Sequence, residues 1–139
     1  MGRNSFEELQ VNIRIKLAAL WTALMFFYIY GDYFKLYIPG EAGRLVAGDT
    51  NLNTPISLLA ASILLAIPPL MIVASVMAST KVARATNIIF GFVFTGIMLL
   101  IAVTSIDLEW VAYVFYALVE SAITLVIIWQ AWTWPKAAN

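Results

Sequence analysis

The sequence predicts an all-α protein, a bundle of four transmembrane helices preceded by a short amphipathic helix. Hydrophobic residues make up 63% of the 139 residues and charged residues only 12%, whereas about a quarter of the residues of a soluble domain are charged. The apolar residues gather in runs of about twenty, the length that a helix needs to cross a ~30 Å hydrocarbon layer. Strands that cross a membrane would alternate over ~10 residues instead.

The apolar runs predict spans at about residues 17–38, 56–79, 85–106 and 110–133. Pro39-Gly40 ends the first span. Thr54 is a suitable N-cap for the second, because Pro55 would stand at the first helical position, where a missing N–H costs nothing. Between these spans, Glu41 to Ala47 is expected to add one or two helical turns.

Two adjacent prolines, Pro68 and Pro69, stand near the centre of the second span. They remove the N–H bonds to the carbonyls of Leu64 and Leu65, so a bend is expected there. A static kink is the simpler interpretation, since neighbouring groups often satisfy the released carbonyls in membrane helices. The alternative is that these carbonyls line a cavity or form a hinge.

Residues 1–15 are expected to form a cytoplasmic amphipathic segment, and residues 16–139 the four-helix transmembrane domain. Ser5 and Glu8 fit a capping box. Helical spacing places several apolar side chains on one face, so a short helix could lie along the inner membrane surface. The side chains on that face are Phe6, Leu9, Ile13 and Leu17.

The distribution of basic residues predicts the orientation of the bundle, because cytoplasmic loops carry an excess of Lys and Arg. One side of the membrane has only Lys35 and Arg44. The opposite side has Arg3, Arg14, Lys16, Lys81, Arg84 and Lys136. We therefore expect a multi-pass protein of the inner (plasma) membrane with both termini in the cytoplasm.

The composition also excludes several kinds of chemistry. Histidine and cysteine are absent and the formal net charge is zero, so the usual metal ligands, reactive thiols and near-neutral proton carriers are missing. No basic run marks a nucleic-acid surface. We expect no metal, no cofactor and no nucleic-acid partner. An intramembrane enzyme is the weakest hypothesis, because only Asp32, Glu120 and tyrosines remain as proton handlers.

Glu120 is the most informative residue. It lies ten residues after Trp110 and about as far before the cluster of Trp129, Trp132 and Trp134, hence ~15 Å deep at ~1.5 Å per residue. Carboxylates inside a membrane are costly and mark candidate functional sites. Helical spacing places Tyr113, Tyr116, Glu120, Thr124 and Ile127 on one face. Either Glu120 binds a ligand or exchanges protons, with the tyrosines as donors, or it is protonated and hydrogen-bonds a neighbouring helix.

The first span carries a similar face, formed by Trp21, Met25, Tyr28, Asp32 and Lys35. Asp32 lies ~10 Å below the outer surface, and an ion pair with Lys35 would explain it without a ligand. In the third span, small and polar residues at four-residue spacing predict close helix packing; these are Ala83, Asn87, Gly91 and Thr95. The candidate ligand- or proton-binding residues are Glu120, Asp32, Tyr116, Tyr113, Asn87, Tyr28 and Trp21.

From about Lys16 to the end, the chain resembles a family of small bacterial four-helix membrane proteins that is catalogued only as a domain of unknown function. The similar residues are Leu20-Trp21, Asp32, Ile67-Pro68, Arg84, Asn87, Gly91, Tyr113, Tyr116, Glu120 and the ending Ile127-Ile128-Trp129-x-Ala131-Trp132-x-Trp134. The resemblance implies an architecture and no activity. Members often carry an acid before the Ile-Pro pair, where this chain has Ala66.

The function that we expect is binding or transport of a small amphipathic or cationic molecule at the intramembrane carboxylate, with or without proton exchange. The alternative is a structural or accessory subunit of a larger membrane complex, whose polar faces only hold helices together. The lipid bilayer is a partner in either case. A homo-oligomer, most simply a dimer, is also expected, because one four-helix unit leaves much small-residue surface for neighbours.

Overall fold

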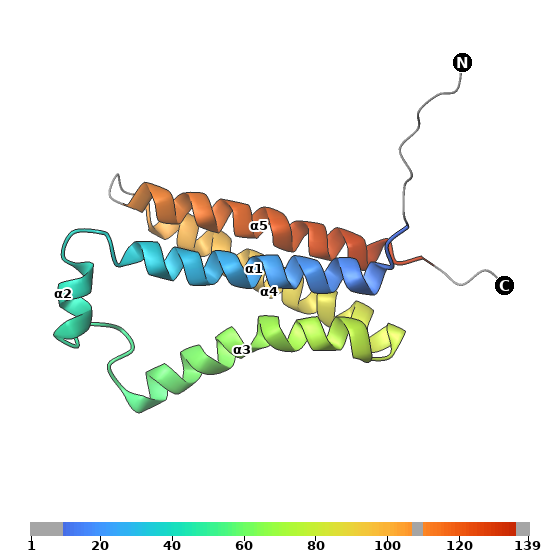
Figure 1. Cartoon of the computed structure of the whole chain (residues 1–139), viewed down its shortest axis with the longest axis horizontal. Helices are drawn as coiled ribbons and strands as arrows, with labels where there is room; N and C mark the ends of the chain where they lie inside the picture. The colour runs from blue at the N-terminus through green and yellow to red at the C-terminus, as the bar shows by residue number, and fades with distance from the viewer. Residues whose placement is uncertain (1–9, 107–109, 136–139) are drawn as a thin grey trace, which may run out of the picture.

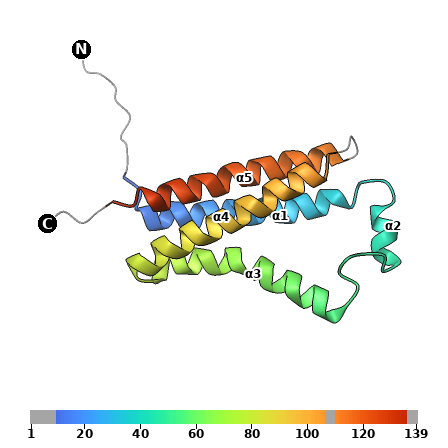
Figure 2. The same cartoon turned by 180° about the vertical axis from the view of Figure 1, so that it is seen from behind.

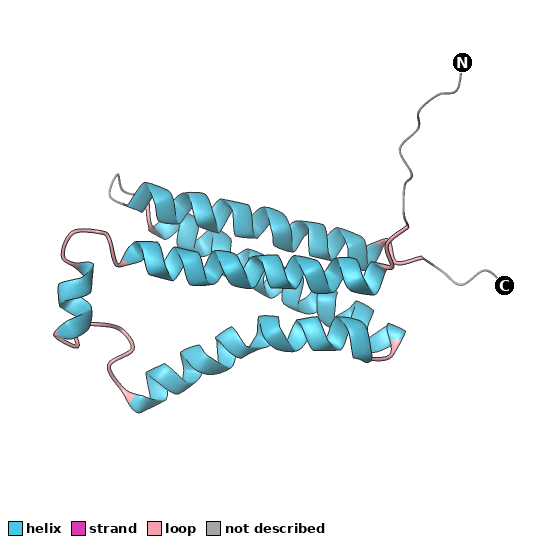
Figure 3. Ribbon diagram, viewed as in Figure 1, coloured by secondary structure: helices cyan, strands magenta, loops and turns pink. Residues whose placement is uncertain are grey.

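The computed structural model describes residues 10–106 and 110–135 of the chain, and these residues form helices and no strand (Figures 1 and 3). The helices are α1 (Ile13–Lys35), α2 (Glu41–Val46), α3 (Pro55–Met77), α4 (Thr80–Thr104) and α5 (Val111–Trp132). All but α2 are long and apolar enough to cross a membrane. The predicted all-α architecture with four candidate spans is therefore confirmed, and so are the helical turns predicted after Pro39-Gly40.

The four long helices form one bundle. Helix α5 packs against α1 and α4, and α3 packs against α1 and α4 (Figures 1 and 2). Helix α2 lies across one end of the bundle, and the chain passes from α3 to α4 at the opposite end (Figure 1). This arrangement brings the four spans around a common interior.

Helix α1 begins at Ile13, where the Asn12 side chain accepts a hydrogen bond of 2.9 Å from the backbone N–H of Arg14. Residues 10–12 are not helical. Ile13 and Leu17, which the sequence grouped with an amphipathic segment, lie in the first turns of α1, and Leu17 is fully buried. Phe6 and Leu9 lie outside the described residues, so the part of the amphipathic segment predicted at residues 1–15 that precedes residue 10 stays a prediction.

Helix α3 begins as expected, with a reciprocal capping box between Thr54 and Ser57 and with Pro55 in its first turn. It changes direction along its length, and its first part leans away from α1 (Figures 1 and 2). Pro68 and Pro69 lie inside the helix, and all the buried residues of α3 stand at or after Pro68. The bend thus divides α3 into an outward-leaning first half and a packed second half.

The side chains of the core come from all four long helices. Leu17, Trp21 and Leu24 of α1 meet Met71 of α3 and Phe94 of α4, and the other members of this cluster are Met98, Ile127 and Ala131. The predicted small-residue face of α4 is buried, and its members Gly91 and Thr95 contact α5. A Cβ added to Gly91 would lie 2.6 Å from Ile128 Cγ1, so the two helices approach too closely there for a larger residue.

Two arginines close the C-terminal ends of helices, where backbone carbonyls lack intrahelical partners. Arg14 donates hydrogen bonds of 2.7–3.2 Å to the carbonyls of Ser75, Val76 and Ala78 at the end of α3. Arg84 donates to the carbonyls of Ala131 and Trp132 at the end of α5, at 3.1 and 3.2 Å. From the sequence, these residues had counted only as charges that orient the bundle.

Candidate binding cavity

A cavity of about 150 Å³ lies between α1, α3, α4 and α5. Its walls differ in character. The wall from α1 and α5 carries polar side chains, which are Tyr28, Asp32, Tyr113, Tyr116 and Glu120 together with Gly31 and Ala117. The wall from α3 and α4 is apolar and consists of Leu64, Leu65, Phe94, Ile97, Met98 and Ile101.

Glu120 lies on the polar wall and is buried, with 5% of its surface exposed. Its carboxylate comes close to α1, since a Cβ added to the buried Gly31 would lie 4.0 Å from Glu120 Oε1. No other described residue forms a hydrogen bond or an ion pair with the Glu120 side chain. In the alternative interpretation, a protonated Glu120 would form a hydrogen bond with a neighbouring helix. Within residues 10–106 and 110–135 no such bond is found.

Aromatic side chains line the same cavity as Glu120. Tyr28 stacks on Phe94 with ring centroids 6.1 Å apart, and Tyr116 stacks on Phe34 at 6.3 Å. The Tyr28 hydroxyl is buried and, among the described residues, has no hydrogen-bond partner. A buried hydroxyl without a partner is unfavourable by about 1–3 kcal/mol, and Tyr28 is one of the residues that line the cavity.

Asp32 also lines the cavity, but its side chain is exposed and stands at the edge rather than in the interior. The expected ion pair with Lys35 does not form. The Lys35 ammonium instead lies over the rings of Trp110 and Tyr113, 5.5 and 5.9 Å from their centroids, where the negative face of each ring attracts it. Tyr113 thus borders both the cavity and this bound ammonium group.

Trp21 and Asn87 do not line the cavity, contrary to their grouping with Glu120 at the sequence level. They are fully buried, and Trp21 Nε1 donates a 2.7 Å hydrogen bond to Asn87 Oδ1. Asn87 Nδ2 donates to Ser75 Oγ at 3.0 Å and to the Ala83 carbonyl at 2.8 Å. Because each polar group of Asn87 has a partner, this network serves the packing of α1, α3 and α4.

The structure therefore brings together five of the seven candidates, Tyr28, Asp32, Tyr113, Tyr116 and Glu120. Most of the apolar wall was not identified from the sequence, since apolar residues in a membrane helix carry no distinguishing signal. One signal did exist. Pro68 and Pro69 pointed to Leu64 and Leu65, and both residues line the cavity. Ala66, at the position where the resembling family often has an acid, is exposed and not part of it.

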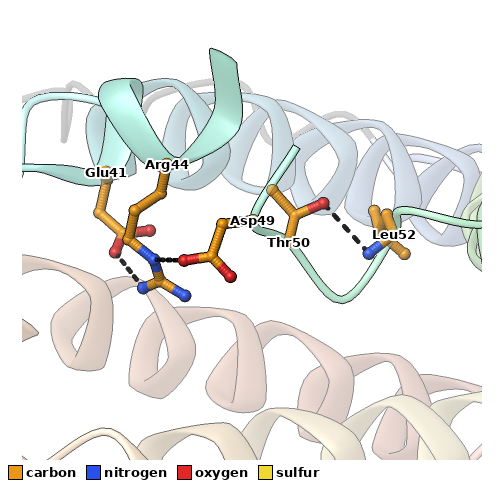
Figure 4. Close-up of polar contacts among 5 residues, drawn as sticks. All are labelled: Glu41, Arg44, Asp49, Thr50 and Leu52. Carbon is orange, nitrogen blue, oxygen red and sulfur yellow. Dashed lines mark hydrogen bonds and ion pairs between the residues drawn. The ribbon is translucent and has the colours of Figure 1, made fainter. Parts of the chain in front are cut away.

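A separate polar cluster lies at the α2 end of the bundle (Figure 4). Arg44 donates to Glu41 Oε1 at 2.9 Å and to Asp49 Oδ2 at 3.1 Å. The hydrogen bond that Arg44 donates to Asp49, together with the charges of both acids, raises the pKa of Arg44. The Thr50 hydroxyl accepts from the Leu52 N–H at 3.3 Å. These contacts shape the connection between α1 and α3 and lie apart from Glu120.

In the described part of the chain, no group of three or more Asp, Glu, His or Cys residues is arranged to hold a metal ion. The chemistry available in the cavity is that of two carboxylates, Glu120 and, at the edge, Asp32, with phenolic hydroxyls and aromatic rings. Such a set of groups recognises a cation by charge, by hydrogen bonds and by cation–π contacts.

No curated protein and no solved structure matches the chain. The model of a family of unknown function, DUF6326, matches residues 5–139. The resemblance to an uncharacterised family is thereby confirmed, and the chain, with its four apolar helices around a buried glutamate, belongs to the family DUF6326.

Proposed function

We propose that this protein binds a small amphipathic cation in the cavity between α1, α3, α4 and α5, with Glu120 as the counter-ion. One observation carries the proposal: a buried carboxylate faces a cavity whose opposite wall is apolar. An acid within a bundle that crosses a membrane is costly to retain. A ligand ammonium group would offset that cost by pairing with it.

The aromatic rings support a cationic ligand in particular. Rings of Tyr, Trp and Phe attract ammonium groups, and cages of such rings recognise quaternary ammonium ligands. Tyr28, Phe94 and Tyr113 all line the cavity. The contact between Lys35 and Tyr113 is an example within this molecule of a ring at the cavity receiving an ammonium group.

The volume of the cavity and the different polarity of its two walls indicate the size and the composition of the ligand. A cavity of about 150 Å³ equals the engineered apolar cavity that holds a benzene molecule. The ammonium group would lie against Glu120 and the tyrosines, and an apolar group of benzene size against Leu64, Leu65 and Met98. Benzylammonium has this composition and is a suitable probe.

Isothermal titration calorimetry with benzylammonium on the purified protein in detergent tests the proposal. We expect Glu120→Gln to lower the affinity about tenfold or more, since it removes the charge that pairs with the ligand. Asp49→Asn removes an exposed acid far from the cavity and should leave the affinity unchanged. Tyr28→Phe, which removes the unpartnered hydroxyl, should weaken binding without changing the charge.

Neutral benzyl alcohol separates charge recognition from filling of an apolar space. The native protein should bind benzylammonium more tightly than benzyl alcohol, and Glu120→Gln should lose this preference. If a folded Glu120→Gln variant kept its affinity for benzylammonium, the proposal would be wrong. Uptake into liposomes under a pH gradient, lost in the same variant, would extend the function from binding to proton-linked transport.

A further inference from the structure

A second hollow lies at the end of the bundle opposite α2, where α4 begins and α5 ends. This groove has a volume of about 520 Å³. Its lining consists of Thr80, Lys81, Arg84, Ala85, Ile88, Trp134 and Pro135. Two of these residues are basic, and none of the described lining residues is acidic. The cavity at Glu120 shares no residue with it.

Two lining residues of the groove, Trp134 and Arg84, are positioned by contacts with residues outside the groove. The Arg14 guanidinium lies 5.6 Å from the centroid of the Trp134 ring, and Arg14 is itself fixed by its bonds to the end of α3. Arg84 is held by the carbonyls of Ala131 and Trp132. Lys81 is exposed, and its ammonium group forms no hydrogen bond or ion pair with any described residue.

The groove changes in character along α4. Lys81, Arg84 and Ile88, with Ala85, follow one another at three- or four-residue spacing and thus share one face of the helix. The face is basic at Lys81 and Arg84, near the end of the bundle. It becomes apolar at Ala85 and Ile88, further along the helix. A phospholipid has the same order, since a charged phosphate precedes its acyl chains.

We propose that this groove binds one anionic phospholipid, with the phosphate at Lys81 and Arg84 and an acyl chain along Ala85 and Ile88. Charge complementarity favours an anionic lipid over a zwitterionic one, because two basic side chains and no described acid line the site. Basic residues next to a membrane-spanning helix attract anionic lipids by about 1 kcal/mol each. Trp134 closes the groove at the level of the headgroups, where Trp is enriched.

Native mass spectrometry of the purified protein tests this proposal, with dioleoylphosphatidylglycerol as the anionic lipid and dioleoylphosphatidylcholine as the zwitterionic one. We expect the native protein to retain phosphatidylglycerol preferentially. Lys81→Ala should lower that retention about fivefold, the ratio that one surface charge contributes. Lys16→Ala is the matched control, because Lys16 is an exposed lysine at the same end of the bundle and does not line the groove.

Ala85→Trp tests the acyl-chain half of the site. Ala85 is exposed, so the larger side chain would fill the groove without entering the core, and retention should fall although no charge changes. The proposal would be overturned if Lys16→Ala and Lys81→Ala reduced retention equally, or if both lipids were retained alike. Displacement of the lipid by millimolar inorganic phosphate would also overturn it, since it would assign the site to a free phosphate.

Discussion

Single glycines decide how closely the helices of this protein approach one another. Gly91 of α4 allows contact with α5, where an added Cβ would lie 2.6 Å from Ile128 Cγ1. Gly31 of α1 admits the carboxylate of Glu120 at an ordinary contact distance. Gly96, one turn beyond Gly91 on the same helix, has nothing within 4 Å of an added Cβ. Identical residue types in similar helices therefore have different structural roles.

Gly91→Ala and Gly96→Ala form a matched pair that tests this difference. We expect Gly91→Ala to destabilise the bundle by about 1–3 kcal/mol, because the new methyl group overpacks a close contact. Gly96→Ala should be neutral or stabilising by up to about 1 kcal/mol, since alanine favours helix more than glycine does. Unfolding in increasing SDS, followed by circular dichroism, measures both. Equal effects of the two substitutions would contradict the close contact at Ile128.

At the scale of elements, the bend in α3 determines the apolar side of the cavity. The first half of α3 leans away from α1 (Figure 1) and holds none of that helix's buried residues. Leu64 and Leu65, one turn before Pro68 and Pro69, nevertheless line the cavity. From the sequence, one alternative was that the carbonyls of Leu64 and Leu65 line a cavity. The position of these two residues in the cavity wall agrees with that alternative.

The double variant Pro68→Ala/Pro69→Ala tests whether the bend maintains the cavity. Restored N–H bonds to the carbonyls of Leu64 and Leu65 should straighten α3 and move its first half toward the bundle. We expect benzylammonium affinity to fall by about tenfold, that is ~1.4 kcal/mol, as measured by calorimetry. Pro55→Ala is the control, because a proline in the first helical turn replaces an N–H that has no intrahelical acceptor. If α3 became straight and the affinity for benzylammonium did not change, the bend would not be required for binding.

At the scale of the whole molecule, the two ends of the bundle differ in charge and in structure. One end holds α2 and the cluster around Arg44. The other holds Arg14, Lys81 and Arg84, and the chain passes there from α3 to α4 (Figure 1). The positive-inside rule assigns the second end to the cytoplasm. The same arginines also close α3 and α5, so orientation and helix termination depend on the same side chains.

Cysteine labelling measures the orientation directly, because the chain has no cysteine of its own. Asn51→Cys places a thiol in the connection between α2 and α3, and Ser79→Cys places one between α3 and α4. We expect a membrane-impermeant maleimide to label Asn51→Cys in intact cells and Ser79→Cys only after permeabilisation. The reverse pattern would invert the predicted topology. Labelling of both in intact cells would contradict the prediction that α3 crosses the membrane.

The predicted dimer also belongs to this scale. Ser62 and Ala66, four residues apart on α3, are small and exposed and would allow a second copy to approach closely. Analytical ultracentrifugation in two mild detergents should give the mass of a dimer. Only monomer in both would contradict the prediction. A stoichiometric heteromeric partner that copurifies would instead favour the accessory-subunit alternative.

The candidate site was partly predictable from the sequence. Helical spacing placed Tyr113, Tyr116 and Glu120 on one face of α5, and Tyr28 and Asp32 on one face of α1, because a 3.6-residue period fixes which side chains share a face. Spacing also grouped Trp21 with them, whereas the structure pairs Trp21 with Asn87. The helical period shows which residues share a face of a helix. It does not show which neighbouring helix that face contacts at each position along the bundle.

The sequence by itself determined the class of the protein, the number and approximate bounds of its long apolar helices and the place of Glu120 near the middle of the last one, because these follow from the length and polarity of local segments. Only the tertiary structure decided which residues meet. The apolar wall opposite Glu120, the contact of Lys35 with Trp110 and the closure of α3 by Arg14 join residues far apart in the chain. Such contacts depend on the angles at which the helices cross and on how far each helix is shifted along its neighbour. Because the sequence is apolar almost throughout, many helix packings are compatible with the same pattern of apolar residues.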